Sequence, residues 1–151
     1  MPWAAGGTGY PGRPVRITES IRIDRSPEDV WAVVSDLDTH TAWRPALVEF
    51  RQVSEGPLEV GTRIREVLRV GKREVEIEDV VTAHEPPRLL ALHGGWKAAE
   101  FDVEFRLEPD GDGTLVTMDW PFYPKSLLMR VATQFLKRTM GKATREELEK
   151  L

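Results

Sequence analysis

The sequence predicts one α+β domain in which an antiparallel β-sheet packs against a long C-terminal helix. Three observations predict this fold class. A capped helix follows the first apolar strand, segments with alternating apolar residues fill the middle of the chain, and an amphipathic helix ends it. The 151 residues are enough for a single domain with a substantial core.

The first elements can be placed by composition and periodicity. Residues 1–13 are rich in Gly and Pro, so we expect a flexible tail there and a single domain over residues 14–151. Val15, Ile17, Ile21 and Ile23 alternate with polar residues and predict the first strand.

A short helix pair is expected after this strand. Ser26 suits an N-cap and Pro27 suits the first helical position, and Val30 and Val34 lie on one face of the helix they begin. The turn Trp43-x-Pro45 then closes the segment.

The middle of the chain predicts an antiparallel meander. Alternating segments are expected as strands at residues 47–54, 62–70, 73–83, 100–107 and 114–120, with a further strand that leads into His93. Asp110-Gly111-Asp112-Gly113 is the clearest hairpin signal. In the strand through Phe101 and Phe105 the intervening residues are charged, so we expect that face to be solvated.

The last helix is expected from about residue 125. Its apolar stripe, which we expect to face the sheet, contains Leu127, Leu128, Val131 and Phe135, and Gly141 is expected to break the helix near its end.

The order of these pieces resembles the START-like, or SRPBCC, superfamily. The resemblance rests on the strand at 17–24, the Ser-Pro-Glu-Asp-Val-Trp helix with Asp36, Trp43-x-Pro45, Gly56-Pro57-x-x-x-Gly61-Thr62 and the terminal helix. It implies a helix-grip fold: a curved antiparallel sheet of about six or seven strands around the C-terminal helix, two short helices after the first strand, and an internal cavity.

The resemblance also implies a small hydrophobic ligand in that cavity. One interpretation is a cofactor-independent polyketide cyclase or dehydratase that positions its substrate and moves a proton. The other is a carrier or sensor that binds a lipid-like or aromatic ligand unchanged.

Composition excludes several other classes. A formal charge of −4 argues against a nucleic-acid partner, and the absence of Cys excludes thiolate chemistry. No stretch approaches about 20 apolar residues, so we expect no membrane insertion and a cytoplasmic protein. The histidines lack ligand spacing and no phosphate loop is present, so we expect neither metal nor cofactor. A monomer and a homodimer both remain open.

Three acids interrupt apolar rows of the predicted strands, namely Glu19, Glu66 and Asp79. Either they lie at strand ends or bulges and reach water, or they point into a pocket as acid/base groups. For Asp79, the Val80-Val81 pair hints at a bulge that would reset the alternation.

His93 is the fourth candidate for proton transfer, because histidine titrates near neutrality. It lines the pocket if Leu89 and Ala91 point inward, and it lies outside if Leu90 and Leu92 do. His40 and His84 are expected at the surface or as capping residues.

Aromatic residues at element ends are placed by the resemblance at the cavity rim. Arg44 could hold a carbonyl or anionic group there, although an exposed arginine on a turn is the simpler interpretation. The predicted ligand contacts are Trp43, Arg44, Trp96, Phe101, Met118, Trp120, Tyr123, Leu128 and Phe135.

Overall fold

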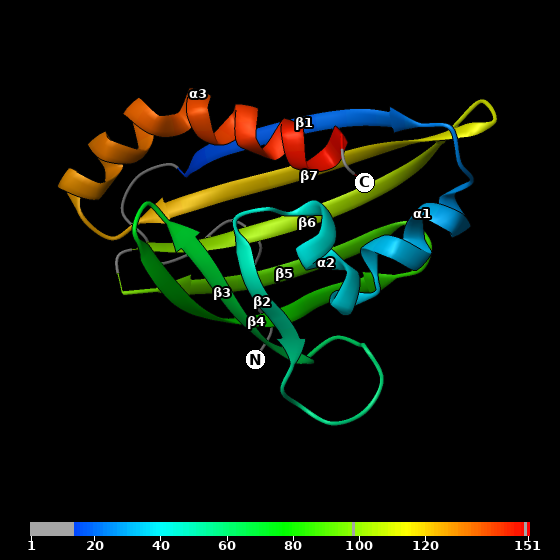
Figure 1. Ribbon diagram of the computed structural model, residues 1–151, viewed down its shortest axis with the longest axis horizontal. Helices are drawn as coiled ribbons and strands as arrows, with labels where there is room; N and C mark the ends of the chain where they lie inside the picture. Colours follow the sequence, from blue (N-terminus) through cyan, green and yellow to red (C-terminus); the bar gives the residue numbers. More distant parts are fainter. Residues whose placement is uncertain (1–13, 98, 150) are drawn as a thin grey trace.

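The computed structural model describes residues 14–97, 99–149 and 151 (Figure 1). The predicted tail at residues 1–13 lies outside the described residues. The elements follow in chain order: β1 Val15–Ile23, α1 Pro27–Val34, η1 Leu37–Thr39, α2 His40–Trp43, β2 Leu47–Gln52, β3 Arg63–Val70, β4 Arg73–Glu85, β5 Leu89–Trp96, β6 Ala99–Asp110, β7 Gly113–Pro124 and α3 Leu127–Glu149.

The strands form one seven-stranded antiparallel sheet in the order β1-β7-β6-β5-β4-β3-β2. The last strand therefore pairs with the first, and the segment from α1 to α2 carries the chain from β1 to β2 at the opposite edge. The predicted fold class is confirmed: a curved antiparallel sheet, two short helices after β1 and a long C-terminal helix.

One face of the sheet, which we call the inner face, carries the core. Across the sheet, Val81 of β4 pairs with Leu92 of β5, and Leu90 of β5 pairs with Phe105 of β6. All four are buried, and they cluster with Val34 of α1. The inner face thus meets α1, as α1 also contacts β6 and β7.

Helix α1 begins as predicted. Ser26 adopts an extended backbone and its Oγ accepts a hydrogen bond from the backbone N–H of Asp29 at 3.2 Å, with Pro27 in the first turn. Val30 and Val34 are its buried residues. A local capping signal therefore fixes where the chain leaves β1.

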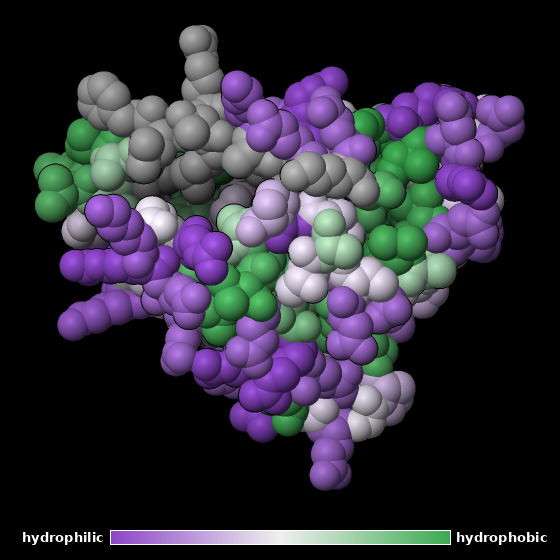
Figure 2. All heavy atoms as spheres, viewed as in Figure 1, coloured by the Kyte–Doolittle hydropathy of each residue, from purple (hydrophilic) through white to green (hydrophobic). Residues whose placement is uncertain are grey.

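Helix α3 covers less of the sheet than its apolar stripe predicts. It packs mainly against β1 and β7, and its first turns extend beyond the start of β1 (Figure 1). Leu127, Leu128 and Val131 are consequently 78%, 81% and 47% exposed, so the prediction that they face the sheet is wrong. Figure 2 shows the apolar surface of this view as separate patches among hydrophilic side chains. Leu148, near the other end, is buried.

The predicted break at Gly141 is also wrong, because α3 continues through it to Glu149. A Cβ at Gly141 would lie 3.3 Å from Oε1 of Glu19 and 3.9 Å from Cγ2 of Ile17. The glycine thus allows close approach of α3 to β1 rather than ending the helix.

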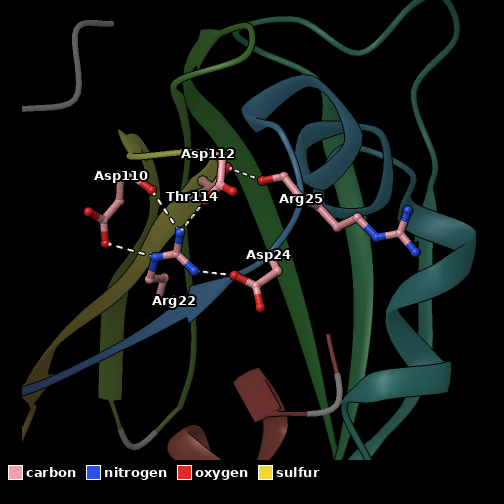
Figure 3. Close-up of polar contacts among 6 residues, drawn as sticks. All are labelled: Arg22, Asp24, Arg25, Asp110, Asp112 and Thr114. Atoms are coloured by element: carbon pink, nitrogen blue, oxygen red, sulfur yellow. Dashed lines mark hydrogen bonds and ion pairs between the residues drawn. The ribbon is translucent and has the colours of Figure 1, made fainter.

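The β6–β7 hairpin is tied to the end of β1 by Arg22 (Figure 3). Its guanidinium donates to the backbone oxygen of Asp110 and to Oδ1 of Asp112, both at 3.0 Å, and also pairs with Asp24. These acids raise the pKa of Arg22, the hydrogen bond to Asp24 contributing most. Beside them, Thr114 Oγ1 donates to the backbone oxygen of Arg25 at 2.7 Å.

We expect the substitution Gly113→Ala to destabilise the domain by about 2 kcal/mol, because the added methyl group has no room. Its Cβ would lie 2.6 Å from the backbone oxygen of Ile23 and 2.8 Å from Nη2 of Arg22. Urea denaturation of the variant and the parent protein measures the loss in the free energy of unfolding.

Gly111→Ala is the matched control in the same hairpin. It meets only Arg22 Nη2, at 3.8 Å, although its φ of 61° carries a backbone strain of about 1 kcal/mol. A Gly113→Ala protein as stable as the parent would contradict the close packing of β1 on the hairpin.

Candidate functional site

Two of the predicted acids meet on the inner face of the sheet. In the β3–β4 register Asp79 pairs with Ile64, and Glu66 pairs with Ile77, so the two carboxyl groups are diagonal neighbours on one face. Asp79 is 0% and Glu66 3% exposed. The interpretation that they reach water is therefore wrong for both residues.

Arg44, at the C-terminal end of α2, joins this pair. Its Nη2 donates to Oε1 of Glu66 at 3.4 Å, and its guanidinium carbon lies 5.5 Å from the ring centroid of Phe50. Arg44 is 7% exposed, so the interpretation as an exposed turn residue is wrong. We call Arg44, Glu66 and Asp79 the acid cluster.

Burial raises the pKa of Asp79 well above its ordinary value, and the neighbouring Glu66 adds to this effect through its charge and a side-chain hydrogen bond. Burial therefore favours the protonated form of Asp79. The acid cluster thus places a carboxyl group whose neutral form is favoured beside a second buried carboxyl group that pairs with Arg44.

Gly94 provides the space for Asp79. It lies between Asp79 on β4 and Phe101 on β6 in the register of the sheet. A Cβ on Gly94 would come within 1.8 Å of Oδ1 of Asp79 and 3.2 Å of Cγ2 of Ile77. The carboxyl group thus leans across β5 over a residue that has no side chain.

Beyond Gly94 lie four packed rings, which we call the aromatic cluster: Trp96, Phe101, Trp120 and Phe122. Phe101 and Phe122 stack with centroids 5.7 Å apart, and Trp120 lies 5.8 Å from Phe101 and 5.3 Å from Phe122. Trp96 contacts Phe122 at 5.5 Å. Trp96 and Trp120 are half-buried, so an apolar ring surface adjoins the acid cluster.

Glu19 is not part of this site. It lies on β1, four strands from β4, which corresponds to about 19 Å across the sheet. Its Oε2 lies 3.7 Å from Nη1 of Arg145 on α3. The structure therefore gives Glu19 an ion-pairing position between β1 and α3.

His93 lies on the opposite face, because Leu90 and Leu92 are the residues of β5 that point inward. Its Nδ1 is 2.8 Å from Oδ1 of Asp102 and its Nε2 is 3.3 Å from Oε1 of Glu100. The structure does not bring His93 together with Asp79.

Tyr123 lies on this outer face as well, and its hydroxyl donates to Oδ2 of Asp102 at 3.1 Å. Burial, followed by the nearby Asp102, raises the pKa of Tyr123 to about 12. Asp102 is 8% exposed, so the prediction of a fully solvated outer face on β6 is wrong there. The reason is the pair of side-chain contacts from His93 and Tyr123 that cover it.

The other predicted ligand contacts are distributed over the fold. Trp43 is buried in the core, 6.1 Å from the ring of Phe105. Met118 is buried on the inner face opposite Phe105 in register, and Leu128 is exposed at the start of α3. The side chain of Phe135 lies outside what the structure describes.

Sequence reasoning missed His40. This residue is fully buried, its Nε2–H donates to the backbone oxygen of Val34 at 2.7 Å, and its ring stacks on Phe50 at 4.7 Å. Burial, and then the charge of Arg44, lowers the pKa of His40 to about 3. The expectation of a surface or capping role is wrong because tertiary packing encloses the turn; His84 is half-buried against Trp31.

Gly94 was missed too, although a signal was present. A Gly-Gly pair within a predicted strand is typical of a place where another group approaches the backbone closely.

Within the described ranges, no group of three or more His, Asp or Glu side chains is arranged to hold a metal ion. No helix among these residues is long and apolar enough to cross a membrane.

Comparison with known proteins identifies the family. Residues 14–151 match the family described as polyketide cyclase/dehydrase and lipid transport, so the chain belongs to this family. No curated protein matches the sequence significantly.

Solved structures share the fold at low sequence identity. The protein TTHA0849 from Thermus thermophilus is 15% identical with a TM-score of 0.73, covering 90% of this chain and 93% of its own. The ZhuI aromatase/cyclase from Streptomyces sp. R1128 is 12% identical with a TM-score of 0.69 and the same coverage. A START superfamily protein from Mycobacterium smegmatis is 16% identical with a TM-score of 0.67, covering 89% and 97%.

Proposed function

We propose that the chain binds a small hydrophobic molecule on the inner face of the sheet and acts on it by proton transfer, as a cofactor-independent cyclase or dehydratase. The observation that carries this proposal is the position of the buried Asp79, whose pKa is raised, beside Glu66 and next to the aromatic cluster. Rings position an apolar substrate. Asp79, whose raised pKa favours the protonated form, supplies an acid, and Glu66, which pairs with Arg44, supplies a base.

The acid cluster can perform a dehydration without a cofactor. Asp79 donates its proton to a leaving hydroxyl group, which departs as water, while Glu66 accepts a proton from the neighbouring carbon. A proton then passes from Glu66 to Asp79 and restores the starting state. Arg44 holds Glu66 in place through the 3.4 Å contact.

The family description and the name of one structurally similar protein support this proposal. The family includes polyketide cyclases and dehydrases, and ZhuI is named an aromatase/cyclase. The same description also includes lipid transport, which favours the second candidate, a carrier that releases its ligand unchanged.

Native mass spectrometry of the purified protein, with extraction of any released molecule, tests the binding. We expect a retained hydrophobic molecule. A mass equal to that of the denatured chain, together with no binding of aromatic probes, would contradict the proposal.

Asp79→Asn distinguishes the enzyme from the carrier. Incubation of the released molecule with wild-type protein should change its chemical identity, and Asp79→Asn should slow this change by about 100-fold or more while binding is retained. Arg16→Lys, at a half-exposed position on β1, is the control and should turn over normally. A molecule that emerges unchanged from the wild-type protein would favour the carrier.

A further inference from the structure

The start of helix α3 presents apolar side chains to solvent. Leu127 and Leu128 are 78% and 81% exposed, and Val131, one turn further along the helix, is 47% exposed. Figure 2 shows apolar side chains at the left edge of the molecule, where α3 begins in the same view. Exposed apolar side chains that gather in this way are typical of an interaction surface.

Basic residues lie around these apolar side chains. Because neighbouring strands are antiparallel, the β3–β4 turn, the β5–β6 turn and the end of β7 all lie at the end of the sheet where α3 begins (Figure 1). Exposed cations lie in or next to each of these three places, namely Lys72, Arg73, Lys97 and Lys125. We call these four cations, together with the three exposed apolar residues of α3, the basic end.

The charges of the chain are divided between the two ends of the sheet. Between Asp119 and Glu146 the sequence contains Lys and Arg but neither Asp nor Glu, although the whole chain has a formal charge of −4. At the opposite end of the sheet, three acids gather around Arg22 (Figure 3), namely Asp24, Asp110 and Asp112. The domain is therefore polarised, and an anionic surface attracts the basic end and repels the other.

Two acids on the strands that adjoin the basic end are engaged with partners of their own. Oε2 of Glu74 lies 4.0 Å from Nη2 of Arg69, and Oε1 of Glu100 lies 3.3 Å from Nε2 of His93. The cations of the turns thus add positive charge beside the exposed leucines.

We propose that the basic end docks on the surface of an anionic lipid membrane. Leu127, Leu128 and Val131 enter the boundary between headgroups and acyl chains, and the four cations contact lipid phosphates. The phosphates of a nucleic acid would match the cations but would leave the leucines in water. This inference goes beyond the proposed function and does not rest on it, because the basic end contains no residue of the acid cluster or the aromatic cluster.

Sedimentation with lipid vesicles tests the inference. Wild-type protein should bind vesicles of phosphatidylcholine with about 30% phosphatidylglycerol about tenfold more tightly than vesicles of phosphatidylcholine alone. Salt at about 0.5 M should remove most of this difference, because it screens the attraction between the cations and the lipid phosphates.

Two double variants separate the apolar and the charged contributions. Leu127→Ser combined with Leu128→Ser should weaken binding to the anionic vesicles by about tenfold or more. Lys72→Gln combined with Lys125→Gln should also weaken it by about tenfold, and should leave binding to pure phosphatidylcholine unchanged. Circular dichroism checks that each variant is folded, and if the leucine variant is not, the lysine variant decides.

Val60→Ser and Arg25→Gln are the matched controls. Both side chains are exposed at the opposite end of the sheet, in the β2–β3 loop and after β1 respectively. Both variants should bind the anionic vesicles like the wild type.

Three results would overturn the inference. Equal binding of the wild type to the two kinds of vesicle, or binding to neither, would show that the basic end does not recognise an anionic membrane. Wild-type affinity in the leucine variant would show that the leucines do not contact the lipid. A dimer in light scattering that the leucine variant dissociates would mean that a second copy covers them. The proposed function would stand in all three cases, because ligand binding on the inner face is measured separately.

Discussion

Lowering the pH from 7 to 4 is expected to destabilise the fold by about 3 kcal/mol through the single buried side chain of His40. The ordinary pKa of histidine is 6.5, and burial lowers that of His40 to about 3 in the folded protein. Between these values the unfolded chain binds a proton that the folded chain excludes. Stability is therefore present at neutral pH and is lost as the pH falls below about 6.5.

Urea denaturation at pH 7 and pH 4 measures this effect, with His40→Phe as the reference. Phenylalanine keeps the stacking on Phe50 but cannot titrate. The variant loses the hydrogen bond to Val34 at both pH values, so its stability should fall less between them than that of the wild type. Equal losses in the two proteins would show that His40 is not buried in its neutral form.

The titration of Asp79 has the opposite effect on the pH dependence of the stability. Its pKa is raised in the folded state, so the folded chain binds the proton more tightly than the unfolded chain does. Stability from this residue is lost as the pH rises above the unfolded pKa. In Asp79→Asn this loss of stability should be absent. Urea denaturation of the variant and of the wild type at pH 4 and pH 7 measures the difference.

Gly94→Ala is expected to destabilise the domain by about 3 kcal/mol and to disrupt the acid cluster. The added Cβ would lie 1.8 Å from Oδ1 and 3.0 Å from Cγ of Asp79, and 3.2 Å from Cγ2 of Ile77. The short side chain of Asp79 is fully buried between β3 and β5 and has little space into which to move.

A double-mutant cycle with Asp79→Ala tests the cause. If the clash with the carboxyl group dominates, Gly94→Ala should cost much less in the Asp79→Ala background, with a coupling of about 1–3 kcal/mol. Additive effects would mean that Gly94 is required for another reason, and the proposed leaning of Asp79 over β5 would be incorrect.

Local signals in the sequence were sufficient for most of the fold. Ser26 and Pro27 set the start of α1 through a cap, and the Asp-Gly-Asp-Gly turn set the β6–β7 hairpin. The long-range placement of α3 was less accurate, because an apolar stripe does not tell which part of a helix reaches the sheet. Leu127 and Leu128 lie beyond it, whereas Leu148 reaches the core.

The arrangement of the candidate site depends on the pairing register of the strands, which could not be predicted from the sequence. A register irregularity does occur in β4, but between Val81 and Ala83, so it follows Asp79 and leaves this residue pointing inward. The face of His93 and the position of Gly94 opposite Asp79 follow from the β4–β5 and β5–β6 pairings. The burial of His40 and Arg44 depends on how α2 packs against β2.

We propose that a ring-bearing ligand binds on the inner face beside Asp79. The most direct test is an NMR titration of the protein with 2-naphthol, followed through the indole N–H signals of its tryptophans. We expect the signals of Trp96 and Trp120 to shift, while that of Trp31 on α1 stays in place. Shifts confined to Trp31, or none at all at saturating probe, would contradict it.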